Sequence, residues 1–425
     1  MTIPNSLFCP GEIKCTYSYG NGMLLYYHTN LGGKQMKKLI ALLLALVMVL
    51  SLAACGGGSS EETEATEAAA SNSDVIYFGM STPITGNNAE GGVMMTVGAQ
   101  LAIDDINAAG GINGKKVELK IMDNKSDTKE SPEIARKFVQ DPEVLAVCGD
   151  YASGQSMAAA PVYEEGGLVQ ISPTSSASGF PVMGDYQFSV AGIASDESPS
   201  YVQKVLVEAF KVKRFAIIYA NSDWGVEVAD TIKALAEEAG IEVVAFESYM
   251  EGDKDFTAVL SKIRQAEPDH MLLACQYTEG GLIVNQVKQM GWDIFMSTQG
   301  SLTQPSFCDL VGEANVAGIA SAIFTEENPD GYEFAQRFVA HPNSGGIQPS
   351  MRASFSYDAI MLLAEAAKQC GDDLTRANLR DKLIAIKDFP AVAGGTITFE
   401  PEGYAHRVYN VVSIQDGMWK PYKGE

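Results

Sequence analysis

The feature that most constrains the fold of this chain is an alternation of short apolar runs with amphipathic stretches, which begins near residue 74. The runs VIYFGM, KVELKIM and VLAVCG (75–80, 116–122 and 144–149) are rich in strand-forming residues, and a stretch with helical spacing of its apolar residues follows each of them. A repeated strand–helix order with nearly continuous apolar strands predicts a parallel sheet that helices cover on both faces.

The same order starts again after Phe188. A helix is expected near 198–210, and the predicted strands that follow it are RFAIIYA, IEVVAF, HMLLAC and DIFMS (214–220, 241–246, 270–275 and 293–297). Two α/β lobes in series are therefore predicted, the first from 74–193 and 325–406 and the second from 194–324 and 407–425. Such lobes place a ligand cleft at the carboxyl ends of both sheets.

The chain before residue 74 has a different character. Lys37 and Lys38 precede an apolar run of 14 residues, Leu39–Leu52, which is shorter than the roughly 20 residues of a membrane-spanning helix. The run ends in LAAC, which resembles the lipoprotein signal box in which the cysteine is lipidated and everything before it is removed. We therefore predict a signal peptide at 36–54 and an extracytoplasmic protein that lipidated Cys55 anchors to the bacterial cell membrane.

Two further segments flank this signal. Residues 55–73 are rich in Gly, Ser, Glu, Ala and Thr and contain no aromatic residue, so we expect a flexible tether that cannot bury enough apolar surface to order itself. Residues 1–35 have neither helical nor strand periodicity, and a signal sequence normally begins with its basic head. We interpret them as an upstream extension from a start codon chosen too early, with translation starting at Met36.

Charge and cysteine usage exclude several classes of function. The chain has 53 acidic and 30 basic side chains and a formal net charge of -23, which argues against a nucleic-acid partner. Cys148, Cys275, Cys308 and Cys370 match no CxxC or zinc spacing, so no metal is predicted. Cys148 and Cys275 lie in apolar runs and are expected to be buried thiols.

Motifs for catalysis or cofactor binding are missing from the sequence. GGINGKK (110–116) lacks the spacing of a phosphate-binding loop, and the segment from Asp123 lacks the glycine of a calcium loop at its sixth position. No GxSxG is present, and no histidine lies in a motif with a nucleophile. We therefore expect neither an enzyme nor a cofactor.

Several segments in order do resemble one family. DDINAAGGINGKKVEL (104–119), GDYASGQSMAAAPVYEEGGLVQISPTSSAS (149–178) and EGDKDFTAVLSKIRQAEPD (251–269) resemble the extracytoplasmic binding proteins of branched-chain amino acid ABC transporters, and the resemblance runs from about 75 to 420. It implies the periplasmic-binding-protein type I fold, with two Rossmann-like lobes of parallel sheets joined by a three-stranded hinge. It also implies a monomer that closes on one small ligand and delivers it to a membrane permease.

The resemblance assigns a ligand site to the ends of the strands. The matching positions are Tyr151, Ser153, Thr174 and Ser176 in the first lobe and Trp224, Gln276, Tyr277 and Gln299 in the second. Independently, a helix from about Gly154 would present unpaired N–H groups to a ligand carboxylate. The alternatives are that Ser153 is a helix N-cap and that Thr174 and Ser176 belong to an ordinary serine-rich turn.

The sequence departs from its relatives at several of these positions. Gln299 stands where amino acid binders commonly have Asp or Glu, so a ligand ammonium would need another partner, for which Glu279 is a candidate. Gly91 and Gly92 stand near a usual aromatic residue and are expected to widen the pocket. Arg352 either meets a second acidic group or points to solvent from a helix start, and the solvent interpretation is favoured.

One covalent feature of the family is also expected to be missing. Ser126 and Ala152 stand near the positions of a family disulfide. Taken together, the residues and the resemblance predict a lipid-anchored solute-binding protein of an ABC importer for an amino acid or related carboxylate. Two alternatives stay open: a non-amino-acid ligand such as an amide or aromatic acid, and a sensory receptor of the same fold.

Overall fold

The computed structural model describes residues 74–322, 324–326 and 328–423. All described residues belong to one compact unit of the chain. The predictions for the signal peptide, Cys55, the tether and the upstream extension lie outside the described residues. Within the described ranges, no helix has both the length and the apolar character to cross a membrane.

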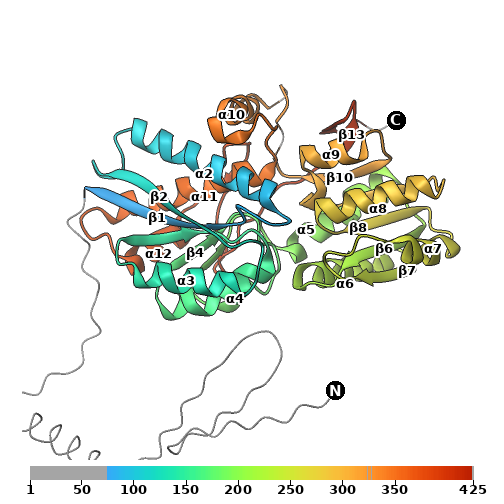
Figure 1. The fold of residues 1–425 in the computed structure, drawn as a ribbon, viewed down its shortest axis with the longest axis horizontal. Coiled ribbons are helices and arrows are strands. Elements are labelled where there is room, and N and C mark those ends of the chain that lie inside the picture. Colours follow the sequence, from blue (N-terminus) through green and yellow to red (C-terminus); the bar gives the residue numbers. More distant parts are fainter. Residues whose placement is uncertain (1–73, 323, 327, 424–425) are drawn as a thin grey trace, which may run out of the picture. The chain divides into compact units, whose positions relative to one another are not determined.

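The first lobe contains a five-stranded parallel sheet in the order β2-β1-β3-β4-β5. Its strands are β1 (Val75–Thr82), β2 (Lys116–Asp123), β3 (Val144–Cys148), β4 (Val169–Ser172) and β5 (Gln187–Ser189). Helices α3 (Glu130–Gln140) and α4 (Ser153–Glu165) pack on one face. Helices α2 (Ala89–Ala108), α11 (Met351–Cys370) and α12 (Arg376–Ala385) pack on the other, as Figure 1 shows.

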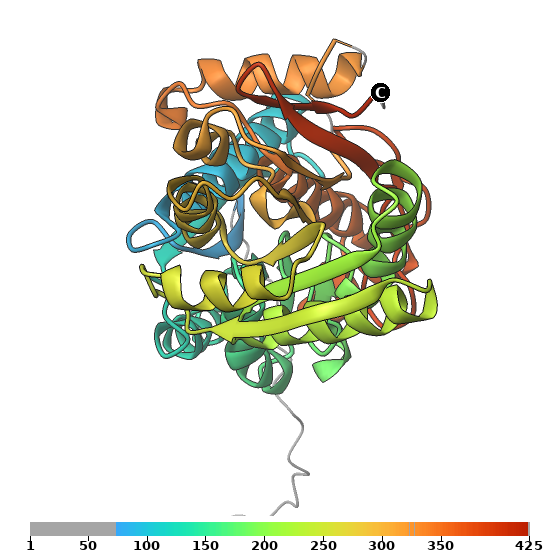
Figure 2. The ribbon, with the colours of Figure 1, turned by 90° about the vertical axis from the view of Figure 1, so that its right-hand side faces the viewer.

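The second lobe contains a seven-stranded sheet in the order β14-β13-β10-β9-β8-β6-β7. Its parallel strands are β6 (Arg214–Ala220), β7 (Glu242–Tyr249), β8 (His270–Ala274), β9 (Phe295–Thr298) and β10 (Val316–Ala320). Helices α5 (Ala194–Tyr201) and α6 (Asp223–Glu238) cover one face; α7 (Thr257–Gln265), α8 (Tyr277–Gln289) and α9 (Pro305–Val311) cover the other (Figure 2).

Both lobes therefore use one strand order, because β7-β6-β8-β9-β10 repeats the sequence order of β2-β1-β3-β4-β5. In such a sheet the second strand in the chain lies on one side of the first strand and the third lies on the other side, so the strand order reverses there. Ligands bind outside the carboxyl ends of the strands at this point of reversal. The chain passes between the lobes three times: after β5, after β10 and before β13. The predicted fold class is confirmed, while the predicted lobe limits remain a prediction.

The structure adds features that the apolar pattern does not reveal. Strand β13 (Asn410–Gln415) pairs antiparallel with β10 and with β14 (Met418–Pro421). The segment GGTITFE contributes β12 (Thr396–Ile397), which pairs with β11 (Phe389–Pro390) outside the main sheets. The helix expected near 198–210 is α5 continued by a π-helix (Val202–Ala209).

Close helix packing supports the first lobe on the side of α11. A Cβ on Gly98 of α2 would lie 2.1 Å from the Ala353 carbonyl oxygen of α11. The glycine thus allows the two helices to approach each other at this point, as a larger residue would not. Helix α10 (Pro329–Ala340) contributes Phe334 and Phe338 to a hydrophobic cluster that also contains Ala353 of α11. This packing holds the start of α11, including Met351 and Arg352, at the end of the lobe where the cavity lies.

Candidate functional site

A cavity of about 320 Å³ lies between residues of the two lobes, a size that suits a small molecule. Its walls come largely from segments that directly follow β3, β4, β6, β7, β8 and β9, together with the start of α11. Six of the eight residues that sequence predicted for the ligand site line it: Tyr151, Ser153, Thr174, Ser176, Trp224 and Gln276.

The first-lobe wall is formed by the start of α4. The extended residue Ala152 precedes the helix, and Ser153 is its first helical residue, so the N-cap interpretation of Ser153 is wrong. The Ala177 N–H donates to Ser153 Oγ (3.1 Å), which leaves the hydroxyl proton available to a ligand. The first helical bond is donated by Ser156 to the Ala152 carbonyl (3.1 Å), so the N–H groups before it are available for an anion.

The loop after β4 is tied to this helix start. Thr174 Oγ1 donates to the Tyr151 carbonyl oxygen. The Ser172 hydroxyl donates to the Asp150 carbonyl (2.8 Å) and accepts the Ser175 N–H (2.9 Å). The two predicted carboxylate-binding segments therefore form one continuous hydrogen-bonded wall, which presents neutral donors.

Asp150 lies beneath this wall and was missed by sequence reasoning. It is fully buried, and its carboxyl accepts hydrogen bonds from Ser81 and from Asn124 Nδ2 (2.8 Å). Weaker bonds arrive from Ser131 Oγ (3.3 Å) and Gln170 Nε2 (3.4 Å). Removal from water raises the pKa of Asp150, because burial disfavours the charged form. The group links β1, α3 and β4 under the loop that carries Ser153.

The glycines of α2 do not widen the pocket as predicted. A Cβ on Gly91 would lie 2.2 Å from Cε2 of Tyr151, and a Cβ on Gly92 would lie 1.8 Å from the Pro83 carbonyl oxygen. The space beside Gly91 is thus filled by the Tyr151 ring, which itself lines the cavity. The Tyr151 hydroxyl donates across the cleft to Gln276 Oε1 (3.4 Å).

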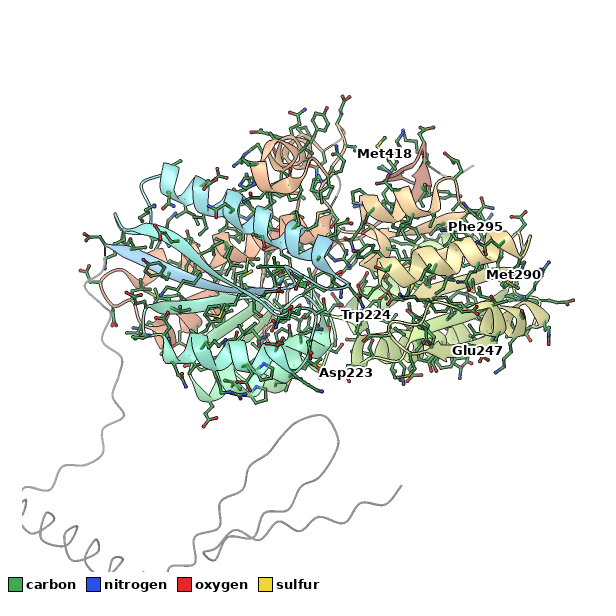
Figure 3. The ribbon with its side chains drawn as sticks, in the orientation of Figure 1. Asp223, Trp224, Glu247, Met290, Phe295 and Met418 are labelled. Carbon is green, nitrogen blue, oxygen red and sulfur yellow. The ribbon has the colours of Figure 1, made fainter. Side chains whose placement is uncertain are left out.

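The second-lobe wall begins at α6. Ser222 caps this helix by accepting the Gly225 N–H (3.3 Å), and Trp224 in its first turn lines the cavity. Figure 3 shows Asp223 and Trp224 at the side of the second lobe that faces the first. The aromatic residue predicted here is half-buried and belongs to the helix start.

Acidic side chains gather on the same side. Glu251 and Glu279 both line the cavity, and Glu279 Oε1 accepts the Gly252 N–H (3.3 Å). Desolvation and the charge of Glu279 raise the pKa of Glu251, since both disfavour a second negative charge. The candidate partner Glu279 is therefore at the cavity, where it is half-buried.

Two predicted residues lie behind the wall. Tyr277 is 8% exposed, and its hydroxyl is 3.5 Å from the Asn87 carbonyl oxygen of the first lobe. Gln299 is 1% exposed, and its Nε2 donates to Ser198 Oγ of α5 (2.9 Å). Neither lines the cavity. Direct ligand contact by these two residues stays a prediction.

The solvent interpretation of Arg352 is wrong. Arg352 is 5% exposed and lines the cavity, with its Nη2 donating to the Ser301 carbonyl (3.0 Å) and its guanidinium over the Tyr151 ring (5.4 Å). Its Nη1 is buried and has no hydrogen-bond partner among the described residues. The N-terminal end of α11 therefore brings a positive charge to the cavity.

A further charged residue at the cavity, Glu197, was not identified from sequence. It lies in the first turn of α5, is 7% exposed, and accepts the Gly300 N–H (3.1 Å) through Oε1. Desolvation raises the pKa of Glu197 to about 7. The only sequence signal was an acidic residue in the segment predicted to cross between the lobes.

Among the described residues, the cysteines form no disulfide and no side chains form a metal site. Cys148, Cys275, Cys308 and Cys370 are free thiols, and the first two are fully buried as predicted. Ser126 and Ala152, near the family disulfide position, both line the cavity. In the described part of the chain, no three His, Cys, Asp or Glu side chains are grouped so that they could hold a metal ion.

Comparison with known sequences decides the family. The sequence model of the periplasmic binding proteins matches residues 75–418, which includes both lobes and the cavity between them. The chain belongs to the periplasmic binding protein family. The Leu/Ile/Val-binding protein homolog 1 of Brucella suis biovar 1 (strain 1330) is 30% identical to it over 301 residues, which are 70% of this chain and 79% of the relative.

Solved structures of other periplasmic binding proteins share the architecture. The branched-chain amino acid transporter substrate-binding protein LivJ of Streptococcus pneumoniae, in complex with isoleucine, is 29% identical with a TM-score of 0.75. The comparison covers 81% of this chain and 98% of LivJ. A solute-binding protein of an ABC transporter from R. palustris, in complex with benzoate, has a TM-score of 0.74 at 19% identity, covering 82% and 95% of the two chains.

These relatives bind transported substrates and are not enzymes. This chain is accordingly a solute-binding protein of the periplasmic binding protein family. The benzoate complex has only 19% identity, so it shows that the fold accommodates a different ligand and carries no assignment for this chain.

Proposed function

We propose that this protein is the lipid-anchored receptor of an ABC importer and captures an amino acid between its two lobes. The observation that carries the proposal is the start of α4, where the Ser153 hydroxyl and the unpaired N–H groups of the first helical turn line the cavity. Hydrogen-bond donors and the positive end of a helix dipole at one place favour a carboxylate. Thr174 and Ser176 extend this seat, and Trp224 and Gln276 cover the ligand from the other lobe.

A thermal-unfolding screen of the full-length protein in detergent tests the ligand class. The probes are the twenty standard L-amino acids, benzoate, glutarate and acetamide at millimolar concentration. We expect at least one L-amino acid to raise Tm by a few degrees, because ligand at 100 times its Kd adds about 2.7 kcal/mol. Stabilisation by benzoate or acetamide with no response to any amino acid would overturn the amino acid assignment.

The membrane anchor is tested separately through Cys55. In cells that express the chain from Met36, Cys55→Ala should move the protein from the membrane fraction to the soluble fraction. The matched control, Cys370→Ala, changes a half-buried cysteine of the folded region and should leave the protein in the membrane fraction. Membrane retention of Cys55→Ala, or peptides from residues 1–54 in the mature protein, would contradict lipidation at Cys55.

Delivery to a permease is tested by uptake. Deletion of the gene should abolish high-affinity uptake of the amino acid found in the screen, and the wild-type gene should restore it. Uptake that is unchanged in the deletion strain would favour the sensory alternative over transport.

A further inference from the structure

The Glu197 carboxylate is the most unusual charged group at the cavity. It is 7% exposed, and its one hydrogen bond in the described structure comes from a neutral backbone N–H, that of Gly300. No ion pair joins it to a Lys, Arg or His of the described residues. A buried carboxylate without a cation costs free energy unless a partner arrives.

Glu197 also lies close to the carboxylate seat. The Ala194 N–H donates to the Ser176 carbonyl oxygen (2.6 Å), so the first residue of α5 is bonded directly to the loop that forms this seat. Glu197 follows one helical turn later, about 5 Å along the axis. Glu197 and Ser176 both line the cavity, so the carboxylate of Glu197 faces the same space as the seat.

The second lobe holds Glu197 in this position. Gln299 Nε2 donates to Ser198 Oγ (2.9 Å), and Ser198 Oγ donates to the Ala194 carbonyl (2.6 Å). The next residue after Gln299 supplies the Gly300 N–H to Glu197. The amide of Gln299 thus fixes α5 through its hydrogen bond to Ser198. The acidic side chain, Glu197, belongs to α5 itself.

We propose that Glu197 receives the ammonium group of the ligand, and that Gln299 is a positioning residue for it. This inference rests on the proposed function and deepens it by assigning the residue that binds the ammonium group of the amino acid. The neutral amide of Gln299 offers no countercharge, so the negative charge that pairs with the amine is supplied by Glu197 on α5.

The other charged side chains described near Glu197 contact groups other than Glu197. Asp196 on the same helix is bound by His406 Nδ1 (2.8 Å), and Arg407 is paired with Asp358 (3.6 Å). Arg352 contacts Ser301, next to Gly300, but makes no ion pair with Glu197. Tyr409 is buried nearby and is held protonated, since burial and Glu197 both raise its pKa.

Isothermal titration calorimetry on the full-length protein tests the proposal with matched ligand pairs. Each L-amino acid that binds is compared with the acid that lacks its amine, for example L-leucine with 4-methylpentanoate, L-glutamate with glutarate and L-phenylalanine with 3-phenylpropanoate. We expect Glu197→Gln to weaken the amino acids by about 10- to 100-fold and the amine-free acids by less than about threefold. Glu197→Asp should recover part of the loss.

Proton release gives a readout that a purely structural role would not change. Because the pKa of Glu197 is raised to about 7, an arriving ammonium should displace up to about half a proton at pH 7. The binding enthalpy of wild type should then differ between phosphate and Tris buffers, and that of Glu197→Gln should not. Arg352→Gln should keep the buffer dependence; its loss would mean that Arg352 is the counterion of Glu197.

The outcomes separate the two proposals. Amino acids that bind Glu197→Gln as tightly as wild type would overturn the role of Glu197 while leaving the protein an amino acid receptor. Binding of amine-free acids alone would overturn the role of Glu197 and the amino acid assignment, but not solute binding. If Ser153→Ala fails to weaken any bound acid, the proposed carboxylate seat fails independently of Glu197.

Discussion

The two walls of the cavity follow the same strand order and differ in charge and in hydrogen bonding. The wall at α4 presents neutral donors, the Ser153 hydroxyl and the unpaired N–H groups of the first helical turn, above the buried Asp150 network. The opposite wall presents the carboxylates of Glu197, Glu251 and Glu279, of which Glu197 and Glu279 each accept a hydrogen bond from a backbone N–H. Equivalent strand ends thus carry complementary chemistry, a donor-rich rigid seat facing an acidic cover, which orients a ligand with separated charges.

The largest effect is expected from the support of the donor wall. Asp150→Ala removes the acceptor of side-chain bonds from Ser81, Asn124, Ser131 and Gln170. Buried donors without partners are costly, so we expect a loss of about 3 to 5 kcal/mol in unfolding free energy by urea titration. Glu279→Ala on the acidic wall is the matched control and should cost less than about 1 kcal/mol; equal losses would erase the difference between the walls.

In the absence of ligand, we expect Glu197 on the acidic wall to make the free energy of unfolding depend on pH. The pKa of Glu197 is about 7 in the folded protein against an ordinary 4.5, so the folded state holds its proton to higher pH than the unfolded state. The contribution of Glu197 therefore falls as pH rises from 4.5 to 7, by up to about 3 kcal/mol. Glu197→Gln should gain stability relative to wild type between pH 5 and pH 8; a constant difference would show that the carboxylate is not desolvated.

Binding should depend on Ser153 by a smaller amount. Ser153→Ala keeps the helix start but removes the hydroxyl donor to the ligand carboxylate, with an expected loss of about 2 kcal/mol, roughly 30-fold in Kd. The measurement is calorimetric titration with the amino acid found in the screen. Ser178→Ala, in the same lobe but outside the cavity lining, is the control; a Ser153→Ala variant with wild-type affinity would remove this residue from the seat.

The smallest effect is expected at the solvated part of the acidic wall. Glu251→Gln removes a carboxylate that is exposed at the cavity edge but partly desolvated, since its pKa is raised, so water and salt screen its charge in part. We expect Kd to change by less than threefold. The change should come from the association rate constant and from its dependence on salt concentration. Both are measured by stopped-flow fluorescence of Trp224. A tenfold loss of affinity would place the ligand amine at Glu251 rather than at Glu197.

Much of the site follows from where strands end. Apolar periodicity located β3, β6 and β8, and four of the residues that the resemblance assigned after these strands, Tyr151, Ser153, Trp224 and Gln276, line the cavity. The same reasoning placed Gln299 after β9, but the direction of its side chain depends on α5, which it contacts through Ser198. Gly91 was misinterpreted for a similar reason, because its missing side chain is replaced by Tyr151 from another loop.

The sequence alone determined the two α/β lobes, the strand ends that carry polar residues and the donor-rich start of α4. These are local properties, since hydrophobic periodicity and helix termini depend on residues a few positions apart. Only the tertiary structure decided that Glu197 meets Gly300, that Arg352 is buried at the cavity and that Asp150 supports the opposite wall. Those contacts join residues that are far apart in the chain, and the strand order and the three passages between the lobes bring these residues together. Burial in the folded protein then decides which charged side chains lack a partner.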